Sequence, residues 1–137
     1  MTSYTEGLTC EQWSQLLDLN QLERIIENIK NDKVNCWTKE MYNLTNRDNK
    51  CLEIGCGTGQ TVGYLGYKGR IVTAVDYSEK SIAMTRNIFS NLGLKNSRCI
   101  CQDAINEDLS FGDGEFDVVY SCGLLEHFEK AERIRIL

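Results

Sequence analysis

Glycines stand at positions 55, 57 and 59, directly after a short apolar segment that contains one acidic residue, Glu53. Glycine adopts backbone dihedral angles that a Cβ forbids, and it lets a ligand approach the main chain closely. The pattern predicts a strand, a tight turn and a helix whose free N–H groups and positive end point at the turn. This segment therefore indicates a site for a nucleotide-like cofactor.

The glycine spacing distinguishes two classes of cofactor. A dinucleotide-binding turn has the pattern G-x-G-x-x-G, which would require glycine where this chain has Gln60 or Val62. The pattern present is E-x-G-x-G-x-G, which resembles motif I of the class I S-adenosylmethionine-dependent methyltransferases. The resemblance implies that Gly55, Gly57 and Gly59 approach the methionine part of the cofactor.

The same resemblance implies roles for two residues close to these glycines. Cys56 would contribute its backbone to the cofactor site. Glu53 would hold the glycine turn and, often through water, the amino group of the cofactor. A carboxylate in a mostly apolar strand is costly unless it is partnered, so we expect Glu53 to have a partner.

A second element fits the resemblance seventeen residues after Gly59. Asp76 closes the apolar run 71–75, and an acid at the tip of a second strand can accept hydrogen bonds from both hydroxyls of a ribose. The alternative is an acid that interacts with the dipole of the next helix. Tyr77 would lie against the adenine face or would simply be exposed, and Ser78 is a candidate N-cap.

A third segment, residues 98–101, leads into Asp103 and Ala104. The resemblance implies that Asp103 meets the adenine amino group and that the backbone N–H of Ala104 meets the ring. Asp103 could equally cap the turn toward Asn106.

A fourth segment, residues 116–128, resembles the stretch F-D-V-V…L-E-H of the same family, so the resemblance extends over about 50–128 and is nearest to the type-11-like, small-molecule group. Ser121 would lie beneath the reactive methyl group. His127 is the only histidine and the only side chain whose ordinary pKa suits base catalysis near neutrality. Its alternative role is to pack against or cap the last helix.

From residue 50 onward, the pattern alternates between strands and helices. We expect strands at about 50–55, 70–76, 98–102 and 116–121, and helices at about 58–67, 78–92 and 124–136. This alternation predicts an α/β fold with parallel strands and right-handed crossovers. The resemblance implies a Rossmann-like three-layer sandwich of order 3-2-1-4-5-7-6, of which strands 3-2-1-4 are present and strands 5–7 are absent.

In the first part of the chain, the pattern predicts helices at about 9–19 and 21–30. Apolar residues also recur at helical spacing from Val34 to Leu44. We divide the chain into an N-terminal helical cap, residues 1–48, and a cofactor-binding half-domain, residues 49–137. We expect Trp13, Trp37 and Met41 to pack against the sheet. The alternative is that this segment covers the cofactor or substrate pocket.

The fourth strand would end the sheet with an open edge at Val118, Val119 and Tyr120. An unpaired apolar edge is a template for association, so we expect a homo-oligomer through it, or else a sticky and marginal monomer. We also expect the sequence to be a fragment of a longer gene product or a shortened reading frame.

Composition limits the partners and the location. The formal net charge is −5 and no Lys/Arg block occurs, which argues against a nucleic-acid partner. No apolar run is long enough to span a bilayer and the N-terminus lacks signal-peptide features, so we expect no membrane partner and a cytoplasmic protein. Seven cysteines without a C-x-x-C pair indicate reduced thiols rather than a metal site.

Three functions remain open. The first is a methyltransferase domain that transfers a methyl group from S-adenosyl-L-methionine to a small molecule and releases S-adenosyl-L-homocysteine. The second is a truncated, non-catalytic module that binds either compound or a partner. The third, a nicotinamide-dependent dehydrogenase half-domain, is disfavoured by Gln60. No motif indicates the acceptor.

Overall fold

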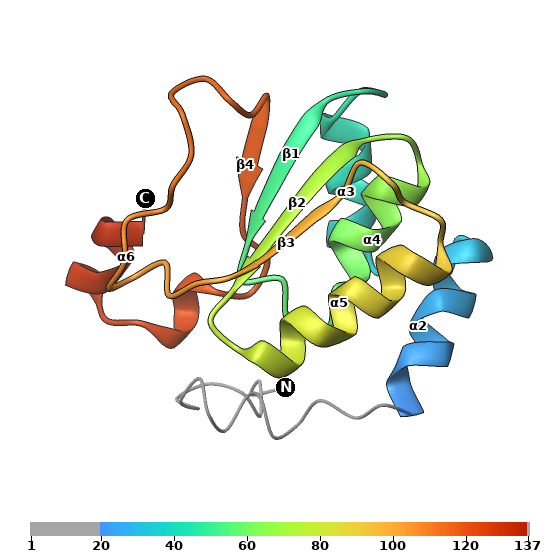
Figure 1. Cartoon of the computed structure of the whole chain (residues 1–137), viewed down its shortest axis with the longest axis horizontal. Coiled ribbons are helices and arrows are strands. Elements are labelled where there is room, and N and C mark those ends of the chain that lie inside the picture. Colours follow the sequence, from blue (N-terminus) through green and yellow to red (C-terminus); the bar gives the residue numbers. More distant parts are fainter. Residues whose placement is uncertain (1–19, 137) are drawn as a thin grey trace.

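The computed structural model describes residues 20–136, which contain a four-stranded parallel sheet. The strands are β1 (Lys50–Ile54), β2 (Ile71–Asp76), β3 (Arg98–Cys101) and β4 (Val118–Tyr120), and their order is β3-β2-β1-β4. All four arrowheads point to the same end of the sheet (Figure 1). The predicted fold class and strand order are confirmed.

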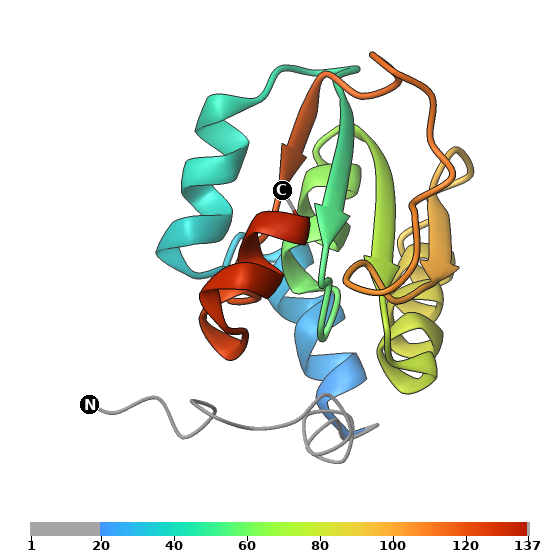
Figure 2. The same cartoon turned by 90° about the vertical axis from the view of Figure 1, so that its left-hand side faces the viewer.

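The two faces of the sheet are covered differently. The helices α2 (Asn20–Lys30), α3 (Cys36–Leu44), α4 (Gln60–Tyr67) and α5 (Glu79–Asn91) lie on one side of the sheet. The segment 102–117 and the short helix α6 (Lys130–Ile136) lie on the other side, with α6 in front of the sheet in Figure 2. The molecule therefore has three layers, and its second outer layer is mostly loop.

The main core lies between the sheet and the helices. Ile29 of α2, Val62 of α4 and Ile88 of α5 are completely buried. A Cβ at Gly63 would lie 2.8 Å from Ile88 Cγ2, so α4 and α5 pack closely at this glycine. Residues of α2 share this core with β1 and β2. The division at residues 48/49 into a cap and a half-domain stays a prediction.

A smaller apolar cluster covers the other face, built on Leu52, Ile54 and Val75. The rings of Phe111 and Phe116 contact it and meet edge to face, with centroids 4.9 Å apart.

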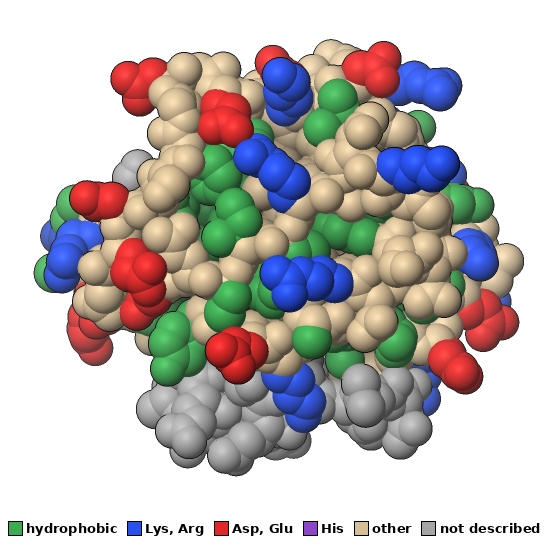
Figure 3. Space-filling view, in the orientation of Figure 1, with side chains coloured by type: hydrophobic (Ala, Val, Ile, Leu, Met, Phe, Trp, Pro, Cys, Tyr) green, Lys and Arg blue, Asp and Glu red, His purple; other side chains and the backbone are tan. Residues whose placement is uncertain are grey.

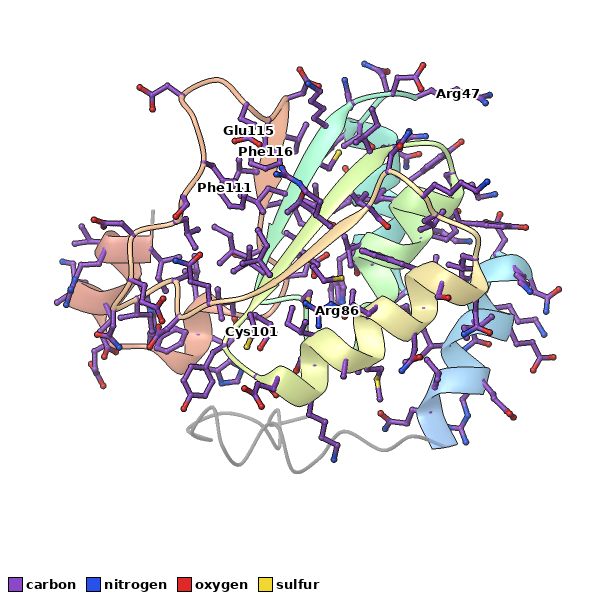
Figure 4. All side chains as sticks on the ribbon, in the orientation of Figure 1. Arg47, Arg86, Cys101, Phe111, Glu115 and Phe116 are labelled. Carbon is purple, nitrogen blue, oxygen red and sulfur yellow. The ribbon has the colours of Figure 1, made fainter. Side chains whose placement is uncertain are left out.

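Contacts of Arg98 hold the segment 102–117 next to this cluster. Its guanidinium lies over both phenylalanine rings and donates to Glu115 at 2.8 Å. Figure 4 shows Phe111, Phe116 and Glu115 together on this side of the sheet. One arginine thus joins the start of β3 to the segment that leads into β4.

The environment of Trp37 differs from the prediction. Met41 packs against the core as expected, but Trp37 is 62% exposed and Thr38 is the buried residue of α3. The hydroxyls of Thr38 and Thr61 form a 2.7 Å hydrogen bond, so the face of α3 that carries Thr38 is turned toward α4. Trp37 therefore lies off that face. Packing of Trp37 against the sheet was therefore a wrong prediction. Trp13 and the helix expected at 9–19 lie outside the described residues.

The helix expected at 124–136 is interrupted. A 3₁₀ turn, η1 (Leu125–His127), is followed by extended backbone at Phe128, and only then does α6 begin. The backbone N–H of Glu129 donates to Glu132 Oε2 at 3.0 Å, as in a capping box. Because this contact starts a new helix, the single-helix prediction was wrong.

The end of the sheet at β4 is open among the described residues. Val119 is 57% exposed, whereas Val118 and Tyr120 are half-buried. The six described cysteines are free thiols. No helix among the described residues is both long and apolar enough to cross a bilayer, and no group of three or more His, Cys, Asp or Glu residues in that part is placed to hold a metal ion.

Candidate cofactor site

A cavity of about 760 Å³ lies at the carboxyl ends of the strands, within the range of about 300–1,000 Å³ typical of ligand sites. Ten of the eleven site residues predicted from the sequence line it: Glu53, Gly55, Cys56, Gly57, Asp76, Tyr77, Asp103, Ala104, Ser121 and His127. Gly59 is the exception. The topology thus brings residues from four separate segments to one cavity.

The glycine turn is held by β2 and by the segment after β4. The backbone N–H groups of Gly55 and Cys56 both donate to Val75 O, at 2.7 and 3.2 Å. Gly55 has φ +78°, and a Cβ there would lie 2.8 Å from Leu124 Cδ1. A Cβ at Gly57, where φ is +55°, would meet nothing within 4 Å, so the open side of this residue is available to a ligand.

Asp76 joins the glycine turn to the tip of β2. Its Oδ2 accepts from the backbone N–H of Gly57, and its Oδ1 accepts from that of Ser78, both at 2.9 Å. Burial raises the pKa of Asp76, and these two hydrogen bonds oppose the rise. Since each carboxylate oxygen can accept two hydrogen bonds, both keep capacity for a ligand hydroxyl.

Glu53 is only 3% exposed and has the partner that its burial requires. The hydroxyl of Tyr120 donates to Glu53 Oε2 at 2.6 Å, and the backbone N–H of Val62 is a second donor. Burial raises the pKa of Glu53 to about 8, and nearby Asp76 adds to the rise. The cavity therefore contains a carboxyl group that a cationic ligand group would help to ionise.

Asp103 caps its own turn. Its Oδ1 accepts from the backbone N–H of Ile105 at 2.9 Å, and its Oδ2 accepts from Asn106 Nδ2 at 2.8 Å. Partial burial raises the pKa of Asp103, but the hydrogen bonds from Asn106 and Ile105 together bring it below its ordinary value. The alternative role as a turn cap is present, and a contact with adenine stays a prediction.

The segment after β4 forms the opposite wall of the cavity. Gly123 has φ +78°, and a Cβ there would lie 3.4 Å from Glu126 Oε1, so this carboxylate lies close to the end of β4. Glu126, His127 and Phe128 all line the cavity. The catalytic role of His127 stays a prediction.

Comparison with known proteins agrees with this geometry. Residues 51–137 match the model of a family described as a methyltransferase domain. The chain belongs to this methyltransferase family.

Two curated relatives illustrate the range of the match. Phosphoethanolamine N-methyltransferase 1 of Arabidopsis thaliana is 32% identical over 81 residues, which are 59% of this chain and 16% of the relative. A ubiquinone biosynthesis O-methyltransferase of Coxiella burnetii is 34% identical over 91 residues, 66% of this chain and 38% of the relative. The chain thus spans well under half the length of these relatives.

Solved structures show the same fold at lower identity. A TehB-like SAM-dependent methyltransferase from Corynebacterium glutamicum has a TM-score of 0.63 at 20% identity, covering 87% of this chain and 64% of the other. A SAM-dependent methyltransferase from Aquifex aeolicus also has a TM-score of 0.63, at 18% identity, covering 94% of this chain and 65% of the other. The class I methyltransferase fold predicted from the glycine turn is confirmed.

The sequence did not single out several residues that line the cavity of the methyltransferase domain. They are Asn35, Gln60, Thr61, Gln102, Glu126 and Phe128. Asn35 carried a usable signal, since an asparagine before a helical stripe is a common N-cap, and its Oδ1 accepts from Thr38 N at 2.9 Å. Trp37 also lines the cavity, which agrees with the covering role considered for it.

Alanine substitutions at Gly59 and Gly57 distinguish a glycine that close packing requires from a glycine that ligand approach requires. A Cβ at Gly59 would lie 2.6 Å from Thr85 Oγ1 and 3.2 Å from Thr85 Cα, and φ is +81°. We expect Gly59→Ala to lower the free energy of unfolding by about 2–4 kcal/mol. Gly57→Ala meets only backbone strain, about 1–2 kcal/mol, but should weaken cofactor binding. Urea unfolding and calorimetry measure both, and equal stability losses would contradict this assignment.

Proposed function

We propose that this chain is an S-adenosylmethionine-dependent methyltransferase domain that methylates a small-molecule acceptor. The observation that carries the proposal is the link between Gly57 and Asp76, made inside a cavity at the carboxyl ends of the strands. An open glycine backbone and a carboxylate with spare acceptor capacity meet at one point. This is the chemistry that a ribose and the chain attached to it require.

The proposal assigns each part of the cofactor to described residues. Asp76 would accept hydrogen bonds from the ribose hydroxyls, and Asp103 with the backbone of Ala104 would bind the adenine. Tyr77, which is 53% exposed, has room to stack on the adenine ring. The cavity walls around Gly55 would hold the methionine part.

Glu53 would bind the ammonium group of the cofactor through its buried carboxylate. The hydrogen bond from Tyr120 holds that carboxylate in place. An ammonium group at this position would restore the charge that burial suppresses, because opposite charges lower a carboxyl pKa.

The cofactor would supply its methyl group as an activated electrophile, and the protein would align the acceptor for in-line attack. Such alignment needs no dedicated side-chain base. Ser121 would line the transfer site at the end of β4, and His127 is the candidate base if the acceptor must lose a proton there.

A small-molecule acceptor is supported by the names of the relatives, which refer to phosphoethanolamine and to ubiquinone biosynthesis. The second candidate function is a module that binds the cofactor without turnover. The chain spans well under half the length of these proteins, so the methyl-transfer assay below also tests for a binding module without turnover.

Calorimetry with S-adenosylmethionine, S-adenosylhomocysteine and NAD tests the cofactor assignment. We expect both adenosyl compounds to bind and NAD not to bind at the same concentrations. Transfer of radioactive methyl groups across amine, phenol and carboxylate acceptors then separates an enzyme from a binding module. Preferential NAD binding, or no adenosyl binding by a folded protein, would overturn the proposal.

The open edge of β4 supports a further part of the proposal, association of two copies through this strand. Light scattering after size exclusion is expected to give a dimer or larger species for the parent protein. Val119→Lys should shift it to monomer, because a lysine blocks strand pairing. Ile134→Lys is the matched control, since Ile134 is exposed but lies on α6. A stable monomeric parent would contradict this part.

A cytoplasmic location and an acceptor other than a nucleic acid also stay predictions. Acidic and basic side chains are interspersed over the face shown in Figure 3. Because phosphate backbones favour a continuous basic face, this pattern supports an acceptor other than a nucleic acid. Fractionation of cells that express the protein, and a filter-binding assay with RNA, would test the two.

A further inference from the structure

The cavity has two halves, and the cofactor assignment uses mainly one of them. Asp76 and Asp103 follow β2 and β3, so they lie at one side of the sheet. The other half is formed by the start of α3, the segment after β4 and the end of α6. Figure 2 shows α3 and α6 on the β4 side of the molecule, away from β3.

Trp37 provides a flat apolar wall in this second half. Trp37 is 62% exposed and lines the cavity. The backbone that carries it is fixed at two neighbouring points, since Asn35 caps α3 and Thr38 bonds to Thr61 of α4. An exposed indole on a fixed helix start is suited to stack on a ligand or to bind a cation over its face.

The charge of the cavity favours one class of ligand. Four carboxyl groups line it, on Glu53, Asp76, Asp103 and Glu126. Among the described residues that line the cavity, none is lysine or arginine. Apart from His127, these residues would offer an anionic acceptor no basic side chain, and the carboxylates would repel it.

Glu126 is the carboxylate that the cofactor assignment does not use. It follows β4 in the same wall as Ser121, and its Oε1 lies close to Gly123 at the end of that strand. An ammonium group in this half of the cavity would have a carboxylate and an indole as partners. Both attract a cation, and neither favours an anion.

We propose that the methyl acceptor is an amine on an apolar framework, without a phosphate or carboxylate group, recognised by Glu126 and Trp37. This inference rests on the proposed function. The bound ammonium would give one proton to His127, the candidate base, and its nitrogen lone pair would then form the N–CH₃ bond. The S–CH₃ bond breaks and its electron pair stays on sulfur, so a sulfonium becomes a neutral thioether and the product is again an ammonium.

Three probes of similar size test this recognition: 2-phenylethylamine, 2-phenylethanol and 3-phenylpropionate. Each is titrated into the protein saturated with S-adenosylhomocysteine, so that the measurement does not need turnover. We expect the amine to bind at least about tenfold tighter than the other two probes, a difference that corresponds to about 1.4 kcal/mol.

Three variants separate the roles of the two residues. Glu126→Gln should remove the preference for the amine, and Trp37→Leu should weaken amine binding, whereas Trp37→Phe should retain part of it. Glu129→Gln is the matched control, because Glu129 is also exposed but does not line the cavity. It should leave the preference unchanged.

The outcomes distinguish this inference from the proposed function. If the folded parent does not bind S-adenosylhomocysteine, the proposed function and the inference about the acceptor are both overturned. If S-adenosylhomocysteine binds but 3-phenylpropionate binds as tightly as the amine, the inference alone is overturned. The same holds if Glu126→Gln binds S-adenosylhomocysteine normally and keeps the full amine preference.

Discussion

Replacing Asp76 with alanine is expected to weaken S-adenosylhomocysteine binding by roughly 100-fold or more. The carboxylate would accept hydrogen bonds from two ribose hydroxyls, and hydrogen bonds to a charged group contribute about 1.5–3 kcal/mol each. Their loss corresponds to about two or more factors of ten in the dissociation constant. Calorimetry on the purified variant gives the value directly.

Asp76→Ala also removes the acceptor of the Gly57 and Ser78 backbone N–H groups, so a control for local structure is needed. Asp117 offers one. Its Oδ2 accepts from the backbone N–H of Lys50 at 2.7 Å, but it lies before β4, at the other end of the sheet from the cavity. Asp117→Ala should therefore lower stability without changing affinity. Equal affinity of Asp76→Ala and the parent would contradict the ribose assignment.

The stability of the ligand-free protein is expected to fall as pH rises from about 5 to about 8. Burial raises the pKa of Glu53 from its ordinary value of 4.5 to about 8, so the unfolded chain loses this proton first. Folding then holds a proton that the unfolded state releases, and stability decreases with pH over this window. The full effect is on the order of 5 kcal/mol, reached above the folded-state pKa.

Thermal unfolding of Glu53→Gln at pH 5 and pH 9 isolates this contribution. The variant should resemble the parent at pH 5 and be more stable than the parent at pH 9, since glutamine does not ionise. Tyr120→Phe should move the window to higher pH, because it removes a donor that favours the ionised carboxylate. A parent whose stability rises between pH 5 and pH 8 in step with Glu53→Gln would rule out this titration.

The cofactor side of the cavity was accessible from the sequence because its chemistry is local. Gly55 and Gly57 reveal a turn through their residue type, and Asp76 marks the end of an apolar run. Parallel strands bring their carboxyl ends to one edge, so residues far apart in the chain can be placed together once the alternation is recognised.

The acceptor side was less accessible because it depends on which way a helix faces. The stripe containing Trp37 and Met41 has helical spacing, yet the structure buries Thr38 and exposes Trp37. The hydrogen bond between Thr38 and Thr61 decides this rotation, and it joins residues 23 positions apart. The break at Phe128 has a local cause, since the cap that joins Glu129 to Glu132 competes with helix continuation.

The sequence by itself determined the parallel α/β fold, the glycine turn and the carboxylate at the tip of β2, because each depends on residue type and short-range spacing. Only the tertiary structure decided the partner of Glu53 and the exposure of Trp37. Those features arise where separate segments pack against one another. No local pattern encodes the contact between Glu53 and Tyr120, which are 67 residues apart in the chain.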